Sequence, residues 1–341
     1  MADFVKVALD AHGGDNAPAE VVKGALLALE ENENLKISLV GVKEMIEKEL
    51  EGCTYDADRL EIIHASEIIQ MAEPPVAAIR KKKDSSIVKG MHLVREGEAD
   101  AFVSCGSTGA VLVGGQVIVG RIKGIERPPL APLIPTRKGF SLLIDCGANV
   151  DAKPSNLVQF AIMGSIYMKK MMGVENPKVG IVNIGAEEEK GNSLVKDTFP
   201  LLKKCPDINF IGSVEAREIP EGDCDVIVCD AFVGNVILKL YEGLSSTLIS
   251  VIKESMMSST RGKIGGALVK PKLKETVKNF SSSEYGGAPL LGLKGLVVKG
   301  HGNSTCVEIK NAIKQCVMFK DSNMLETMKE SFAITDVQED D

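Results

Sequence analysis

Six glycine-rich or polar loops are the parts of this 341-residue sequence best suited to chemistry, because each follows a predicted strand. They lie at residues 10–18 (DAHGGDNAP), 104–109 (SCGSTG), 145–149 (DCGAN), 183–192 (NIGAEEEKGN), 230–235 (DAFVGN) and 299–304 (KGHGNS). Glycine lets the backbone approach a ligand, and the free N–H groups of a helix N-terminus attract anions. Any single loop also fits an ordinary strand-to-helix turn with an N-cap. Several such loops at one sheet edge predict a site for phosphate or for an oxyanion.

Within these loops, small and polar residues are the candidates for contact with phosphate or substrate. They are Gly13, Gly14, Gly106, Ser107, Thr108, Gly109, Asn149, Asn303 and Ser304. Neither the P-loop pattern GxxxxGK[ST] nor the dinucleotide pattern GxGxxG is present, which weighs against nucleotide hydrolysis and NAD chemistry. Cys105 is interpreted as a buried structural thiol. We predict no metal site and no cofactor.

Composition places the chain among globular proteins. Apolar residues make up 44% of it, and eight cysteines occur without CxxC pairs, which favours reduced thiols in a cytoplasmic protein. No secretory signal is recognised, and no apolar run approaches the roughly 20 residues that span a bilayer. Any membrane contact is therefore expected to be peripheral. The net charge of −7 argues against a nucleic-acid partner.

Short apolar runs alternate with helical patterns, as expected of a mostly parallel sheet with helices on both faces in one α/β domain over residues 1–341. The predicted strands are Phe4–Asp10, Lys36–Val40, Leu60–His64, Ala101–Ser104, Ser141–Asp145, Lys178–Asn183, Ile208–Ile211, Asp225–Cys229 and Leu296–Lys299. The predicted helices are Ala19–Glu30, Lys43–Glu51, Thr108–Val119, Asn156–Met172, Ser193–Lys203, Val236–Met256 and Thr305–Met328. The proline-rich stretch 127–135 is open to three interpretations: a hinge, an edge strand or a connector between lobes.

Read in order, the loops resemble the phosphate acyltransferase family of bacterial phospholipid synthesis. The matching stretches include ALDAHGGDNAPAEVVKGA, SCGSTGAVL, LLIDCGANVDAKPSNLVQF, KVGIVNIGAEEEKGN, DVIVCDAFVGNVILKLYEG and YGGAPLLGLKGLVVKGHGNS, between Ala8 and Ser304. The sequence departs from the family pattern at His12, Asn16 and Ala231 and within 104–107. The changes at His12 and Asn16 argue against a base role for the first loop.

The resemblance implies transfer of a long-chain acyl group from acyl carrier protein to inorganic phosphate. It also implies a three-layer α/β/α homodimer similar to phosphotransacetylases and the isopropylmalate dehydrogenase class. The acyl phosphate would pass to a membrane glycerol-3-phosphate acyltransferase. Alternatives are a short-chain phosphotransacetylase that uses acyl-coenzyme A, a non-catalytic membrane-docked scaffold for the carrier protein and, most weakly, a dehydrogenase.

Phosphate is already an anionic nucleophile and a thioester is an activated acyl donor, so direct attack needs position and charge more than proton transfer. Lys190 and Asn192 are the first candidates, as a cation for phosphate and an oxyanion donor; the alternative is a lysine paired with its acidic neighbours. Asn235 is either a donor or the N-cap of a helix that begins there. His301 could protonate the departing thiolate, bind phosphate or only cap a helix.

The segment 244–278 is predicted to form a helical protrusion that touches the membrane. Apolar residues recur at helical spacing, and Ile264, Leu268 and Val269 are the expected contacts. Seven Lys or Arg residues and two glutamates between 253 and 278 give a local net charge of +5, which an anionic bilayer attracts. The alternative is a helix pair that packs a dimer.

Overall fold

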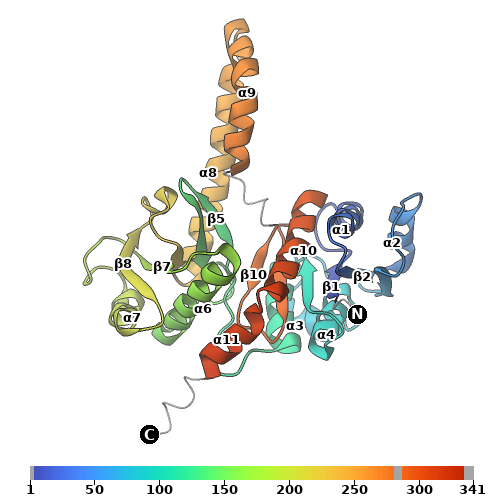
Figure 1. Cartoon of the computed structure of the whole chain (residues 1–341), viewed down its shortest axis with the longest axis horizontal. Coiled ribbons are helices and arrows are strands. Elements are labelled where there is room, and N and C mark those ends of the chain that lie inside the picture. The colour runs from blue at the N-terminus through green and yellow to red at the C-terminus, as the bar shows by residue number, and fades with distance from the viewer. Residues whose placement is uncertain (1–3, 280–285, 334–341) are drawn as a thin grey trace.

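The computed structural model describes residues 4–279 and 286–333, and its strands form two sheets (Figure 1). The first sheet has the order β10-β11-β4-β1-β2-β3. Its strands are β1 (Val5–Asp10), β2 (Leu35–Gly41), β3 (Leu60–His64), β4 (Ala101–Ser104), β10 (Ala288–Leu290) and β11 (Leu296–Lys299). Every neighbouring pair is parallel except β10 with β11. The loops after β1, β4 and β11 therefore emerge side by side at one edge of the sheet.

The second sheet has five strands in the order β5-β6-β9-β7-β8. They are β5 (Leu133–Thr136), β6 (Gly139–Ile144), β7 (Lys178–Asn183), β8 (Asn209–Glu215) and β9 (Val226–Val228). Only the β5 and β6 pair is antiparallel. The predicted α/β class with mostly parallel strands is confirmed, with the strands divided between two sheets.

Helices surround both sheets (Figure 1). Those before β5 are α1 (Ala19–Glu31), α2 (Lys43–Leu50), α3 (Pro75–Lys81), α4 (Ser86–Glu96), α5 (Thr108–Gly114) and the π-helical turn η1 (Gly115–Val119). Those between β6 and β10 are α6 (Pro154–Met172), α7 (Ser193–Lys204), the short η2 (Ile219–Glu221), α8 (Ala231–Met257) and α9 (Thr260–Asn279). The chain returns to the first sheet and continues with α10 (Cys306–Asp321) and α11 (Met324–Ala333).

Alternation along β1 explains why helices cover both faces of the first sheet. Val7 and Leu9 belong to the apolar cluster that includes residues of α1 and α10, whereas Ala8, between them, packs with residues of α4 and α5. Successive side chains of a strand point to opposite faces, so a strand that is apolar throughout must be covered on both. The same argument holds for β6, where Leu142 and Leu143 belong to different clusters.

A continuous core joins the two sheets. The largest cluster contains residues of both, including Val7 from β1 and Leu142 from β6. Within it, Gln315 of α10 donates a 2.8 Å hydrogen bond to the Tyr167 hydroxyl of α6, and both residues are buried. A buried polar group without a partner is costly, so this hydrogen bond favours the observed packing of α10 against α6. The assignment of residues 1–341 to one domain stays a prediction.

Several predicted elements have different bounds in the structure, and two predicted helices are interrupted. The helix predicted over Thr305–Met328 is wrong: α10 and α11 are separate, and Asn323 between them has φ of 54°, a left-handed conformation that ends a helix. The helix predicted over Thr108–Val119 changes to a π-helical turn after Gly114. Sequence patterns did not predict α3, α4 or β10, whereas β5 begins in the stretch 127–135, for which an edge strand was one interpretation.

The proline-rich stretch 127–135 is a connector that ends as an edge strand. The Ala131 N–H donates to Pro289 O at 3.0 Å, so the stretch pairs with β10 of the first sheet before it enters β5 of the second. β5 lies at the edge of its sheet, where proline residues without an N–H are tolerated.

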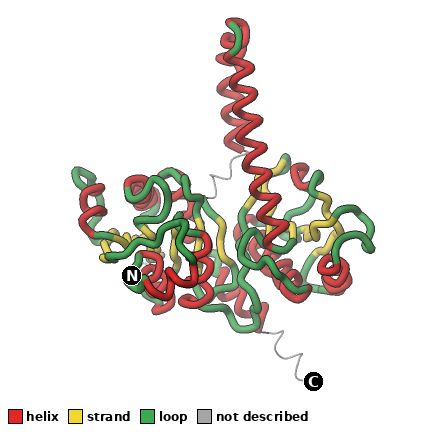
Figure 2. The backbone as a smooth tube through the Cα atoms, turned by 180° about the vertical axis from the view of Figure 1, so that it is seen from behind, coloured by secondary structure: helices red, strands yellow, loops and turns green. Residues whose placement is uncertain are grey.

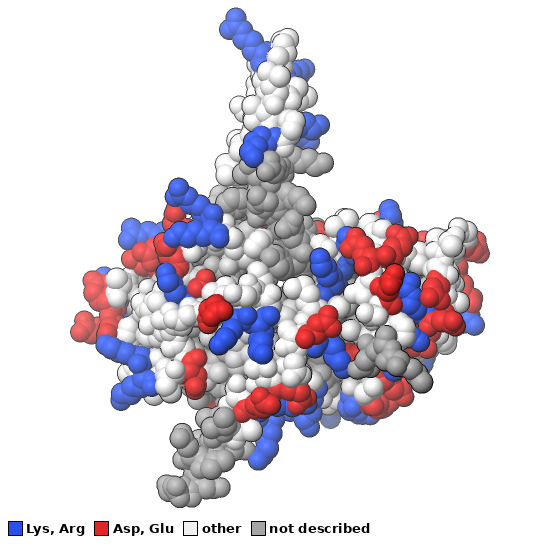
Figure 3. Space-filling view, in the orientation of Figure 1, with Lys and Arg blue, Asp and Glu red and all other residues white. Residues whose placement is uncertain are grey.

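The second half of α8 and all of α9 form a helical pair that projects away from the body in both views (Figures 1 and 2). On the face in Figure 3, Lys and Arg side chains lie along this pair among uncharged residues. Leu268 is 79% exposed, Ile264 61% and Val269 48%. Across 4–279 and 286–333, no helix is long and apolar enough to cross a membrane.

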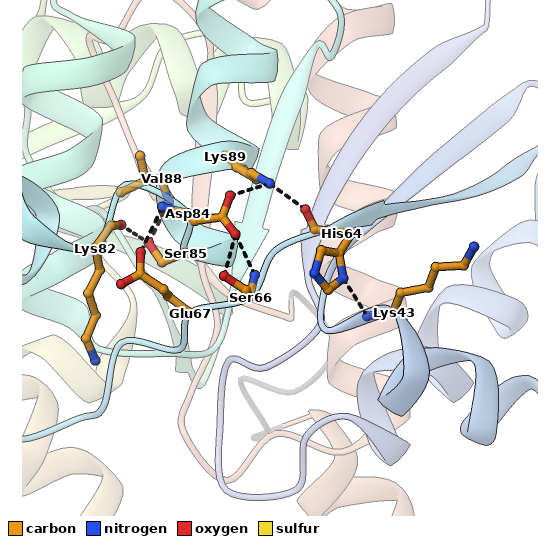
Figure 4. Close-up of polar contacts among 9 residues, drawn as sticks. All are labelled: Lys43, His64, Ser66, Glu67, Lys82, Asp84, Ser85, Val88 and Lys89. Carbon is orange, nitrogen blue, oxygen red and sulfur yellow. Dashed lines mark hydrogen bonds and ion pairs between the residues drawn. The ribbon is translucent and has the colours of Figure 1, made fainter.

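A polar network anchors the loop between β3 and α3 (Figure 4). Asp84 accepts hydrogen bonds from the backbone N–H and the hydroxyl of Ser66, at 2.8 and 2.6 Å, and pairs with Lys89 at 2.5 Å. The contact with Lys89 is the main reason that the pKa of Asp84 lies well below its usual range. Lys82 pairs with Glu73 at 2.6 Å near the other end of the loop. The loop is therefore held at both ends.

Candidate active site

Three loops of the first sheet interlock at its carboxyl edge. The Asp15 N–H donates to Gly302 O at 2.7 Å, and the Gly300 N–H donates to Ser104 O at 3.0 Å. The Asn16 side-chain amide reaches the carbonyls of Asn303 and Ser304 at 3.3 and 3.4 Å. These bonds join the loops after β1, β4 and β11 into one rigid cluster, hereafter the first-sheet loop cluster.

Asp10 is the buried centre of that cluster. Ser104 donates its hydroxyl to Asp10 at 2.6 Å, and the backbone N–H of His12 donates to the same carboxylate at 3.1 Å. A Cβ on Gly13 would lie 2.6 Å from an Asp10 oxygen and 2.7 Å from the Gly106 nitrogen, so only glycine fits there. His12 accepts a 2.8 Å bond from the Val42 N–H through Nε2, and burial lowers its pKa. His12 is thus engaged in packing the fold.

Two loops of the second sheet interlock in the same manner. The buried Asp145 carboxylate accepts from the N–H groups of Leu130 and Asn149, at 2.9 and 2.8 Å. Asp230 caps α8 by accepting from the N–H groups at 232 and 233. A Cβ on Gly234 would lie 1.9 Å from the Asp145 carbonyl oxygen, so α8 packs directly on this loop. Both carboxylates organise loops, since each accepts hydrogen bonds from backbone N–H groups of its own loop or helix start.

A cleft of about 880 Å³ lies between the two sets of loops. Its walls come from α8, from the stretch that leads into β5, and from the first-sheet loop cluster. Among its lining residues are Asp15, Met71, Thr108, Leu130, Leu133, Asn235, Leu238, Lys239, Glu242, Lys299, His301, Asn303, Ser304 and Glu308. The cleft is therefore lined by charged, polar and apolar side chains together.

An ionic group spans the cleft from α8 to the loop after β11. Glu242 pairs with Lys239 at 2.8 Å and with the His301 Nε2 at 3.8 Å. The Glu242 carboxylate raises the pKa of His301, and the imidazole in turn lowers the pKa of Glu242. A raised pKa favours the protonated imidazole, and the protonated form of His301 is the one that can act as a proton donor in the cleft.

The sequence analysis missed Lys239, Glu242 and Lys299. Lys299 ends β11 and is only 8% exposed, and its Nζ contacts the carbonyl oxygens of Cys105, at 3.4 Å, and Gly300. Burial lowers its pKa. The sequence signal for Lys299 is a cationic residue at the end of an apolar strand, just before a glycine-rich loop.

The structure separates the four predicted catalytic residues. Asn235 and His301 line the cleft, whereas Lys190 and Asn192 do not. Lys190 pairs with Glu187 at 2.8 Å, and Asn192 caps α7 by accepting from the Val195 N–H at 2.9 Å. Asn235 lies in the second turn of α8, because the helix begins at residue 231; the expected helix start at Asn235 is wrong.

The nine residues predicted to contact phosphate or substrate also divide. Thr108, Asn303 and Ser304 line the cleft. Ser107 caps α5, and Asn149 donates its amide to Pro128 O and Asp145 at 3.0 and 2.7 Å. The glycines pack against neighbouring loops or elements: Gly13, Gly14, Gly106 and Gly109.

Cys105 is a poor candidate nucleophile. Its thiol is buried, and burial raises its pKa, so the thiolate is disfavoured. Within the described parts of the chain, no three His, Cys, Asp or Glu side chains gather in a way that could hold a metal ion. The cleft residues Lys239, Lys299, Asn235 and His301 offer charge stabilisation, hydrogen bonding and proton donation.

Comparison with known proteins identifies the family of this chain. The family described as fatty acid synthesis protein matches residues 5–327. A phosphate acyltransferase from Clostridium tetani is 51% identical over 326 residues, covering 96% of this chain and 97% of that protein. One from Alkaliphilus oremlandii is 52% identical with the same coverage.

Solved phosphotransacetylase structures share the fold. One from Streptococcus pyogenes has a TM-score of 0.61 at 18% identity, covering 96% of this chain and 95% of that one. The EutD phosphotransacetylase from Staphylococcus aureus has a TM-score of 0.60 at 16% identity, covering 93% and 95%.

Proposed function

We propose a specific reaction from the premise that this chain belongs to the phosphate acyltransferase family and is an acyltransferase. The reaction is transfer of a long-chain fatty acyl group from acyl carrier protein to inorganic phosphate, which yields acyl phosphate for phospholipid synthesis. The observation that carries the proposal is a single cleft lined both by the cations Lys239 and Lys299 with His301, whose pKa Glu242 raises, and by the apolar residues Leu130, Leu133 and Leu238. The cations suit phosphate, and the apolar residues suit an acyl chain.

In this mechanism, a phosphate oxygen attacks the thioester carbonyl and forms the new C–O bond. The C–S bond breaks, and its electron pair leaves with the sulfur. His301 then gives its proton to the thiolate, held in position by Glu242. The step needs no covalent intermediate on the protein.

Asn235 is proposed to donate its amide to the oxyanion that forms on the carbonyl, since it faces the cleft from α8. For Lys190 and Asn192 the proposal requires movement. Lys190 must leave Glu187, and the loop 184–192 must close over the cleft, so these two residues act only once substrate is bound. Asn149 is proposed to support the site indirectly. Its amide holds Asp145, and the loop of Asp145 is the surface on which α8 packs.

The acyl donor is tested by turnover with purified protein. We expect palmitoyl carrier protein and phosphate to give free carrier-protein thiol at a rate that depends on phosphate, and acetyl-coenzyme A to react far more slowly. Faster reaction with acetyl-coenzyme A would identify a short-chain phosphotransacetylase, in keeping with its fold relatives. If neither donor gives acyl phosphate, the remaining interpretation is a non-catalytic scaffold for the carrier protein.

The helical pair of α8 and α9 is proposed to contact the cytoplasmic face of an anionic membrane. Leu268 and Ile264 are largely exposed, and exposed Lys263 and Lys270 lie beside them. Docking would shorten the path of acyl phosphate to a membrane glycerol-3-phosphate acyltransferase. Leu268→Glu with Val269→Glu should abolish co-sedimentation with anionic vesicles, while Met45→Glu on α2 should not. Equal binding by both variants would exclude this contact.

A homodimer is also proposed. Leu240, Leu244 and Leu248 form an exposed apolar stripe near the base of the protrusion, which a second copy could cover. Sedimentation equilibrium of the whole protein tests this, and a mass of one chain at micromolar concentration would refute it.

A further inference from the structure

The buried ammonium of Lys299 lacks the partner that its charge requires. Its Nζ contacts two backbone carbonyls, and no described carboxylate lies within 4.0 Å of it. Removing an ion from water is costly unless a counter-charge and hydrogen bonds replace the water. Because Lys299 lines the cleft, an anion that enters the cleft can supply that counter-charge.

Ser304 provides an independent sign of a ligand beside Lys299. It is 4% exposed and lines the same cleft, yet its Oγ makes no hydrogen bond to the described residues. Its neighbour is the Cys105 thiol, which is a weak partner. A hydroxyl that is buried in a polar cleft without a strong partner is a free donor for an oxyanion.

The acidic residues of this wall are held by other partners or do not reach the ammonium. Glu308 accepts from the N–H and the hydroxyl of Thr305, at 2.6 and 3.0 Å, at the start of α10. Asp10 is occupied by Ser104 and His12. Asp15 lies farther than ion-pair distance, although its charge favours the protonated form of Lys299.

We propose that Lys299 and Ser304 form the subsite that holds the phosphate nucleophile at the floor of the cleft. The ammonium and the hydroxyl bind two phosphate oxygens, and a third faces the thioester carbonyl. Because hydrogen bonds already join the loops of the first-sheet loop cluster, this subsite exists before the acyl donor arrives. The assignment rests on the proposed phosphate chemistry but not on the identity of the acyl donor.

Binding of inorganic phosphate alone tests the subsite. Calorimetric titration and the thermal melt would be followed for wild type, Lys299→Gln, Lys299→Arg, Ser304→Ala and the control Lys310→Gln, whose side chain pairs with Glu31 outside the cleft. In phosphate-free buffer, Lys299→Gln should melt at or above wild type, because it removes a buried cation without a carboxylate partner. Phosphate should raise the melting temperature of wild type and Lys310→Gln but not of Lys299→Gln.

Kinetics sharpen the same test. Lys299→Gln should raise KM for phosphate by roughly tenfold to a hundredfold, and Ser304→Ala should raise it by a smaller factor. KM for the acyl donor should change little in both variants. Lys299→Arg should recover part of the loss. Unchanged phosphate binding in both Lys299→Gln and Ser304→Ala would overturn the subsite. Phosphate binding that depends on Lys299 would stand even if acyl carrier protein proved to be the wrong donor.

Discussion

The loop at 10–16 and the loop at 184–192 have the same kind of sequence but different surroundings. In the first-sheet loop cluster, backbone and side-chain bonds tie three neighbouring loops together, and glycine is required where backbones meet. The loop at 184–192 follows β7, whose neighbours are β9 and β8, and its Lys190 folds back onto its own Glu187. A glycine-rich motif therefore signals a loop near a site, whereas strand order decides whether the loop reaches it.

Alanine at one glycine of each loop provides the strongest contrast. Gly13→Ala should lower the free energy of unfolding by about 1–3 kcal/mol, because the new Cβ meets buried backbone and Asp10. Gly185→Ala should cost less than about 0.5 kcal/mol, because its Cβ meets only the flexible side chains of Lys190 and Glu187. Urea unfolding of both variants measures the difference. Equal losses would show that the loop at 184–192 is as rigid as the cluster.

Removing one predicted catalytic side chain from α8 and one from the loop at 184–192 tests which of these regions contributes to catalysis. Asn235→Ala and Lys190→Ala should each lower turnover by more than roughly tenfold with an unchanged melt, because each removes a group needed mainly in the transition state. Turnover of acyl phosphate formation is the measurement. Wild-type turnover in Lys190→Ala alone would mean that the loop at 184–192 does not close over the cleft.

The pH dependence of turnover tests the contact between His301 and Glu242. Protonated His301 is the active form, so activity should fall as pH rises through its raised pKa. Glu242→Gln should move this fall to lower pH, whereas Lys239→Gln should move it to higher pH by removing a like charge. Because the pKa of His301 is higher in the folded protein than in the unfolded chain, its protonation stabilises the fold. This stabilisation is complete below about pH 6.5 and is lost as pH rises through the pKa of His301 in the folded protein. Superimposable pH profiles would remove His301 from the mechanism.

The smallest effect is expected at Cys105. Because its thiol is buried and its pKa is raised, Cys105→Ala should keep turnover within about threefold of wild type and lose about 1 kcal/mol of stability. Rapid quench followed by mass spectrometry should find no acylated protein. An acyl thioester at Cys105 would replace direct attack by a two-step mechanism.

Local sequence patterns predicted most elements of the fold, because strand and helix periods depend on residues close together in the chain. The glycine-rich loops after strands and the mostly parallel strands followed from such patterns. The break at Asn323 was missed, since a helical pattern continues across it. The division of the strands into two sheets was missed as well, because it depends on pairing between distant segments.

Residue type alone selected Asn235 and His301, which line the cleft, together with Lys190 and Asn192, which do not. The buried setting of Lys299 and the contact of Glu242 with His301 could not be derived in this way. The first arises where the end of β11 meets the loop after β4, and the second where α8 meets the loop after β11; each joins segments far apart in sequence. Burial and proximity set the charge state of such groups, and both are properties of the packed chain.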